Sequence, residues 1–157
     1  MSRFKELSEY KNNILIKLIS NDNLIKALTN NTQDFLDQPL IPDTTNTIYS
    51  EIWPYRYVPD ISDSAKTYLT MAFTNYRKLG NQYKSGNIFF YVFCHKSLVK
   101  TSYGCLRYDY IAGEIDEMFS EERGFGLGKL EFSSMDDIMI NDNYMGVALS
   151  YRVVEFK

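Results

Sequence analysis

Histidine and cysteine are scarce in this chain, which has one histidine and two cysteines among its 157 residues. These are too few for a structural zinc site made only of Cys and His ligands within one chain. Long apolar runs are missing too, and none approaches the roughly 20 residues that a helix needs to cross a bilayer. The chain begins with a charged stretch where a signal peptide would place its apolar core. We therefore expect a protein without a membrane span that stays in the compartment where it is made.

A surplus of positive charge is also missing, because 17 basic residues stand against 20 acidic ones and the net charge is −3. Proteins that grip nucleic acid through their surface are usually basic, so this balance argues against a dedicated nucleic-acid binder. The two thiols, Cys94 and Cys105, are expected to be buried and to act as small hydrophobic groups. A disulfide between them would require a geometry that only a structure can show.

Aromatic residues, in contrast, are abundant: 13 Tyr, 10 Phe and 1 Trp make up 15% of the chain. The length suits a single domain, residues 1–157, that buries a core without help from a metal or a disulfide. The aromatic side chains supply more large apolar surface than such a core needs. We therefore expect part of this surface to lie at an interface.

Two segments precede the predicted sheet. Residues 1–30 have apolar residues at roughly helical spacing and predict a helix, a break at 20–23, and a second short helix capped by Asp22 or Asn23. Residues 32–64, which we call the arm, contain all 4 prolines and predict a long extended connection. A short strand is expected within the arm at 47–52.

Residues 65–157 predict a sheet with one long helix. Residues 106–122 form the clearest helical pattern, with a single apolar stripe that includes Ile111, Ile115 and Phe119. Alternating patterns predict strands at 65–74, 88–94, 127–135 and 144–156, and the polar stretch 75–87 predicts a long hairpin connection. The fold class expected is therefore α+β: a mostly antiparallel mixed sheet with the N-terminal helix and the amphipathic helix packed on it, plus the arm.

No group of residues predicts a catalytic centre. The glycine-rich run 124–128 leaves a helix and enters a strand, which is the reverse of a phosphate-binding loop, so we interpret it as a turn. Cys94 and His95 are neighbours on a predicted strand and would point to opposite faces, where they could not easily share a proton. The carboxylates around the 106–122 helix and in the loop expected after residue 135 are typical of a solvated surface. We therefore expect that the protein is not an enzyme and that it binds no cofactor and no metal ion.

Charge is distributed unevenly along the chain. Residues 1–105 carry 12 basic and 9 acidic groups, or +3, whereas residues 106–157 carry 5 basic and 11 acidic groups, or −6. One hypothesis is that the acidic half faces the passage of an assembly, where it would repel a polyanion rather than hold it. Ordinary solubility is the alternative. The carboxylates that would line the passage are Glu114, Glu117, Glu121, Asp136 and Asp137.

The arm carries the strongest interface signal. Four large side chains of the kinds found at binding hot spots lie close together in it: Trp53, Tyr55, Arg56 and Tyr57. The prolines stiffen this segment and lower the entropy lost when it docks. The alternative is that Trp53 and Tyr55 fold back onto their own sheet.

The order of these features resembles the small neck and tail-completion proteins of tailed bacteriophages, tail terminators in particular. An N-terminal helix leads into the Pro/aromatic arm, and strands then end in the aromatic run 89–93. Residues 104–111 open a helix that continues through 114–119, and a glycine-rich turn with the strand 144–153 closes the chain. The resemblance covers most of the chain.

This resemblance implies a structural virion protein that forms a ring, commonly a hexamer, at the neck of the particle. The ring would end the tail tube and dock to the head-side connector, after synthesis of the protein in the host cytoplasm. Its partners would be other copies of itself and the neighbouring neck and tail-tube proteins, with DNA only passing through. A head-closure or stopper protein is the first alternative, and a small cytoplasmic protein-binding module or an enzyme is the second.

Overall fold

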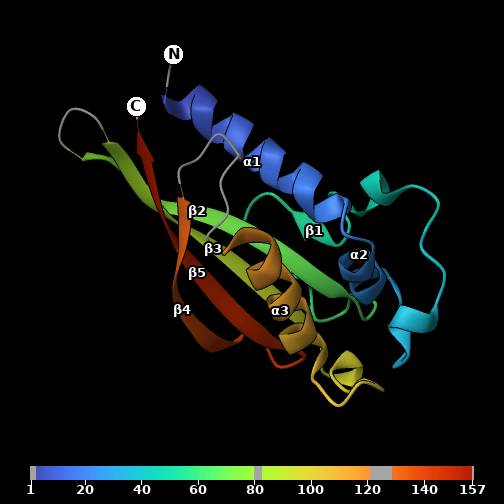
Figure 1. Cartoon of the computed structure of the whole chain (residues 1–157). Coiled ribbons are helices and arrows are strands. Elements are labelled where there is room, and N and C mark those ends of the chain that lie inside the picture. Colours follow the sequence, from blue (N-terminus) through green and yellow to red (C-terminus); the bar gives the residue numbers. More distant parts are fainter. Residues whose placement is uncertain (1–2, 80–82, 121–128, 157) are drawn as a thin grey trace.

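The architecture is a layer of helices packed on one face of a sheet (Figure 1). Over residues 3–79, 83–120 and 129–156, which the computed structural model describes, the chain forms one five-stranded sheet and three α-helices. The helices are α1 (Arg3–Ile19), α2 (Asp22–Thr29) and α3 (Arg107–Phe119). The strands are β1 (Ile52–Trp53), β2 (Thr67–Leu79), β3 (Tyr83–His95), β4 (Lys129–Met139) and β5 (Tyr144–Phe156).

The strands lie in the order β1-β2-β3-β5-β4. β1 runs parallel to β2, and the other neighbouring pairs are antiparallel. β2 with β3 and β4 with β5 are neighbours in sequence, and the long-range pairing of β3 with β5 joins the two halves of the sheet. The expected α+β class, with a mostly antiparallel mixed sheet and the N-terminal helix packed on it, is confirmed.

The main core lies between the helices and one face of the sheet. The apolar stripe of α3 faces inward as its spacing predicts, so that Ile111, Ile115 and Phe119 are fully buried. The Phe119 ring lies 5.2 Å from that of Phe90 in the centre of β3. On the β2 side, the Lys11 ammonium of α1 sits 5.7 Å from the centroid of the Phe73 ring. α1 and α3 therefore lie over different parts of the same sheet face.

Two strand boundaries expected from the sequence are wrong. The polar stretch 75–87 is largely strand, since β2 continues to Leu79 and β3 begins at Tyr83. Ladder hydrogen bonds come from the backbone, so the pairing continues past the bulge between Thr74 and Arg77 without apolar side chains. β4 likewise runs on to Met139, which places Asp136 and Asp137 in a strand and not in the expected loop.

The helical boundaries and the arm also differ in detail from the expectation. α3 ends at Phe119 with Ser120 as its C-cap, and residues 121 and 122 lie outside the described part of the chain, as does the glycine-rich run 124–128. The side chain of Asn21 caps α2 by accepting from Leu24 N (3.0 Å), where Asp22 or Asn23 was expected. In place of a strand at 47–52, the arm has a 3-10 turn (Thr44–Thr47) and the two residues of β1.

One fully buried residue, Arg107, ties the helical layer together. Its guanidinium donates to the carbonyl oxygen of Leu98 (2.8 Å) and lies 4.8 Å over the Phe35 ring. It also donates to three carbonyl oxygens at and beyond the end of α2, those of Ala27 (2.8 Å), Asn30 (2.9 Å) and Thr32 (2.8 Å). Burial lowers the pKa of this group. Arg107 therefore fixes the end of α2 and the start of the arm against the start of α3.

Candidate functional site

The aromatic side chains of the arm lie on the sheet face opposite the helices. The Trp53 ring stacks on the Tyr57 ring at a centroid distance of 4.1 Å and an interplanar angle of 3°. Tyr57 in turn contacts Tyr68 of β2 (5.5 Å), and Tyr68 lies against Phe93 of β3 (5.4 Å). With the buried Tyr144 of β5 these rings form a second apolar cluster. Trp53 and Tyr57 thus fold back onto their own sheet, as the alternative interpretation of the arm expects for Trp53.

The other two candidate residues of the arm point outward. Tyr55 is 49% exposed, and its ring meets the edge of Trp53 at 5.8 Å. Arg56 is exposed but held in place, because its Nη2 donates to Tyr91 Oη (2.8 Å) and its guanidinium lies 5.1 Å over the Tyr91 ring. A stack of partly buried rings therefore supports a surface that carries Tyr55 and Arg56.

Three more apolar side chains of the arm share this exposure. Tyr49, Val58 and Ile61 are each more than half exposed. Tyr49 has a positive φ of 63°, a conformation that non-glycine residues adopt only where their surroundings require it. We call the exposed set Tyr49, Tyr55, Val58 and Ile61 the outer face of the arm. The sequence did not single out Tyr49, Val58 and Ile61. The positive φ that turns the chain at Tyr49 leaves no signal in the sequence, and neither does the inward position of Trp53.

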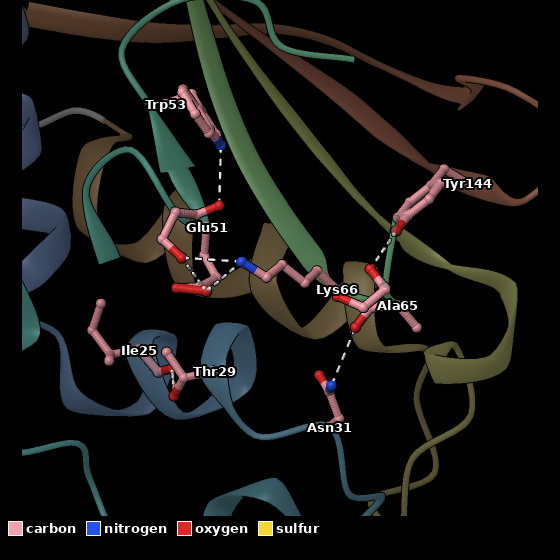
Figure 2. Close-up of polar contacts among 10 residues, drawn as sticks. Ile25, Thr29, Asn31, Glu51, Trp53, Ala65, Lys66 and Tyr144 are labelled. Carbon is pink, nitrogen blue, oxygen red and sulfur yellow. Dashed lines mark hydrogen bonds and ion pairs between the residues drawn. The ribbon is translucent and has the colours of Figure 1, made fainter. Parts of the chain in front are cut away.

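Hydrogen bonds anchor both ends of this aromatic segment (Figure 2). At its start, Trp53 Nε1 donates to the carbonyl oxygen of Ser50 (3.1 Å), and Lys66 Nζ lies 3.8 Å from the carboxylate of Glu51. At its end, Tyr144 Oη donates to the carbonyl oxygen of Ser64 (3.2 Å). In addition, Leu69 N of β2 donates to the carbonyl oxygen of Glu51 (2.8 Å), so the arm is held against the sheet by contacts with β2, with Lys66 just before it and with β5.

The anchoring contacts affect the ionisation of the groups that make them. Burial raises the pKa of Glu51, and the nearby Lys66 ammonium and Ser50 hydroxyl only partly oppose this effect. Burial also raises the pKa of Tyr68 and of Tyr144, so both phenols stay neutral near pH 7. A polar hollow of about 280 Å³ lies between the arm and β2 beside these groups, and an apolar one of about 190 Å³ lies under Arg56.

The residues weighed for nucleophilic chemistry lie apart from this surface. Burial raises the pKa of the Cys94 thiol to about 12, which leaves it protonated near neutral pH. His95 is occupied locally, where its Nδ1 lies 2.8 Å from Ser97 Oγ and accepts from Ser97 N (3.1 Å). In the described residues, His, Cys, Asp and Glu side chains do not gather in groups of three that could hold a metal ion. None of the helices described is both long and apolar enough to span a membrane.

The four candidate carboxylates that the structure describes do not all lie on one surface. Glu114 accepts from Asn21 Nδ2 (3.0 Å) and from Tyr110 Oη (2.9 Å), whereas Glu117 is exposed on α3. Asp136 and Asp137 are successive strand residues and therefore point to opposite faces of the sheet. Glu121 lies outside the described residues.

Comparison with known proteins gives one match. A family model named YomW matches residues 21–153, which is most of the chain. Neither the curated proteins nor the solved structures contain a match.

Proposed function

We propose that this chain, which belongs to the phage-derived YomW family, is a structural protein of the phage neck. In this proposal copies of the chain form a ring, with six copies as the first expectation. The ring ends the tail tube and joins it to the head-side connector. Family membership supports a phage-associated protein, and the ring and its layer in the neck are our extension of it.

The observation that carries the proposal is the construction of the arm. A segment that is stacked on the sheet through Trp53 and Tyr57 presents the apolar side chains of its outer face to solvent. Because Glu51 accepts a hydrogen bond from Leu69 N of β2 at one end and Ser64 accepts one from Tyr144 of β5 at the other, little conformational entropy is lost when this surface docks. Exposed aromatic side chains on a rigid support are the usual centre of a protein interface.

We assign the outer face of the arm to contact with a neighbouring neck or tail-tube protein. Arg56 lies beside it and adds a charged donor, pre-positioned by Tyr91, of the kind enriched at interface hot spots. DNA would pass through the ring without specific binding, in line with the net charge of −3. Of the described carboxylates proposed to line the passage, Glu117, Asp136 and Asp137 are the exposed ones that remain candidates.

The experiment compares two double variants of the arm. Tyr55→Ser with Val58→Ser changes only the outer face, and we expect it to melt close to the wild type but to fail to enter phage particles or to bind the neighbouring neck proteins. Trp53→Ala with Tyr57→Ala removes the stack beneath, and we expect a lower melting temperature. Losing a fully buried aromatic ring costs roughly 3–5 kcal/mol, and these two rings are partly buried, so the cost for each should lie below that range.

Incorporation is measured by immunoblotting of purified particles, and melting by circular dichroism. If the outer-face variant enters particles as well as the wild type, the arm is not the contact surface. If the protein is found free in the cytoplasm of producing cells as a monomer and never in particles, the neck function is refuted in favour of a binding module.

A further inference from the structure

The two edges of the sheet are covered by neighbouring strands to different extents. At one edge, β4 is paired with β5 on one side only. At the other edge, β2 is covered only at Leu69 and Thr70, where the two residues of β1 pair with it. Within the described residues, the outer side of β2 from Met71 to Leu79 has no strand partner. Each edge thus offers backbone donors and acceptors to another strand.

The β4 edge is also bare on the face that carries the helices. Phe132, Met135 and Met139 pair with Tyr151, Leu149 and Met145 of β5, so all three point to the helix side of the sheet. Each nevertheless has about half or more of its side chain exposed. α3 packs mainly on β3 and β5, and its first turn approaches β4 at Asp137, whose charge acts on Tyr108 and Asp109. The three side chains form a largely apolar stripe, interrupted by Asp137 on the same face between Met135 and Met139, which we call the β4 stripe.

The two edges carry opposite charge. α1 and β2 together have six basic and two acidic residues, or +4: Arg3, Lys5, Lys11, Lys17, Arg77 and Lys78 against Glu6 and Glu9. α3 and β4 together have two basic and seven acidic residues, or −5: Arg107 and Lys129 against Asp109, Glu114, Asp116, Glu117, Glu131, Asp136 and Asp137. The uneven charge along the sequence therefore appears in the fold as a charge difference between the two edges of the sheet.

The strand directions are suited to joining these unlike edges. β2 and β5 run one way, whereas β3 and β4 run the other way. In a ring every copy has the same orientation relative to the axis, so β4 of one copy would meet β2 of the next in antiparallel fashion. The alternation of directions would continue from one copy into the next. Joining like edges would instead bring the carboxylates of two β4 strands together, which is destabilising.

We propose that copies of this chain associate head to tail through the two edges of the sheet, β4 of one copy pairing with the free part of β2 of the next. The inference rests on the ring in the proposed function and identifies its subunit contact. α1 lies over β2 on the helix side, so α1 of the next copy would cover the β4 stripe (Figure 1). Ile16, a half-exposed apolar residue of α1, adds to the buried surface. The outer face of the arm stays free for a different protein.

A charge swap tests this contact. Variant A carries Asp136→Lys and Asp137→Lys at the β4 edge, and variant B carries Arg77→Glu and Lys78→Glu at the β2 edge. The test applies to the register that pairs β4 with the free part of β2, shifted along the strands so that Asp136 and Asp137 meet Arg77 and Lys78 and not the β1-covered Leu69 and Thr70. In that register each variant alone sets like charges against each other at every contact. An equal mixture can form an alternating ring in which both kinds of contact join unlike charges. A control with Asp22→Lys and Asp37→Lys makes the same change in net charge as variant A, on exposed positions away from both edges.

Native mass is measured by light scattering for the wild type, for each variant and for the mixture. We expect a multiple of the 18.3 kDa chain for the wild type and the control, 18.3 kDa for A and for B alone, and the multiple again for the mixture. Recovery in the mixture also shows that both variants fold. If either variant fails to fold, it is replaced by Met135→Ser with Met139→Ser on the exposed β4 stripe. We expect this replacement to have the mass of a single chain.

The remaining outcomes separate this contact from the proposed function. If A and B keep the wild-type mass, the edges are not the contact, and the ring stands without it. If both variants fold and become monomeric but the mixture stays monomeric, pairing of unlike edges is refuted. If the wild type is monomeric at every concentration, edge pairing between copies is refuted, and incorporation into particles decides the function independently.

Discussion

Replacing Arg107 by methionine should destabilise the protein more than most single changes. The guanidinium is fully buried and donates to four backbone carbonyl oxygens, at 2.8 to 2.9 Å, from Leu98, Ala27, Asn30 and Thr32. Methionine fills a similar volume without a donor. All four oxygens would lose a charged donor inside the protein.

The magnitude is the balance of two opposing effects. A hydrogen bond to a charged group contributes roughly 1.5–3 kcal/mol, so the loss of four such bonds sets a gross cost of about 6–12 kcal/mol. Removing the guanidinium also removes the penalty of burying its charge, which is several kcal/mol. We therefore expect a net loss of about 3–5 kcal/mol, which is the usual cost of breaking a buried charged contact.

The assay is thermal unfolding followed by circular dichroism. For a chain of this size each kcal/mol shifts the melting temperature by roughly 2–4 °C, so Arg107→Met should melt about 6–20 °C below the wild type. Lys100→Met changes an exposed residue nearby and should stay within about 0.5 kcal/mol. A melting temperature for Arg107→Met within about 2 °C of the wild type would show that the four carbonyl contacts do not hold the helical layer together.

Two further predictions use other features of the fold. A Cβ at Gly146 would lie within van der Waals overlap of the Val92 carbonyl oxygen and 2.6 Å from Phe93 Cα, whereas nothing lies within 4 Å of one at Gly113. Gly146→Ala should therefore prevent stable folding, and Gly113→Ala in α3 should stabilise by about 0.5–1 kcal/mol, as judged by urea unfolding. Because burial raises the pKa of Glu51, the folded state binds this proton more tightly than the unfolded chain, and stability falls as pH rises above about 4.3 through the raised value. The melting temperature of Glu51→Gln minus that of the wild type should increase over this range, and a constant difference would contradict the raised pKa.

The sequence predicted best those elements in which burial follows a regular spacing. The stripe of Ile111, Ile115 and Phe119 places α3 on the sheet because every third or fourth residue must leave water together. The strand at 88–94 was identifiable because both of its faces are apolar. Polar residues in 75–87 concealed the ends of β2 and β3, since backbone pairing does not depend on side-chain polarity.

The site was predicted only in part, because its geometry depends on contacts between distant segments. The composition of the arm drew attention to Trp53, Tyr55, Arg56 and Tyr57, but it could not separate the stacked pair from the exposed pair. That separation depends on which face of the sheet the helices leave open. The role of Arg107 was missed for a similar reason, since its partners are backbone oxygens that any residue could provide.

The pairing of β3 with β5 has a consequence for the order in which the chain folds. β2 with β3 and β4 with β5 can each form as a local hairpin, whereas pairs such as Phe90 with Leu149 join residues far apart in the chain. Closing such a long loop loses much chain entropy before any contact compensates for it, so this step should limit the folding rate. α3 lies between the two hairpins in sequence, and its docking on both strands makes the closure favourable. The central ladder of the finished sheet would then be the last one to form.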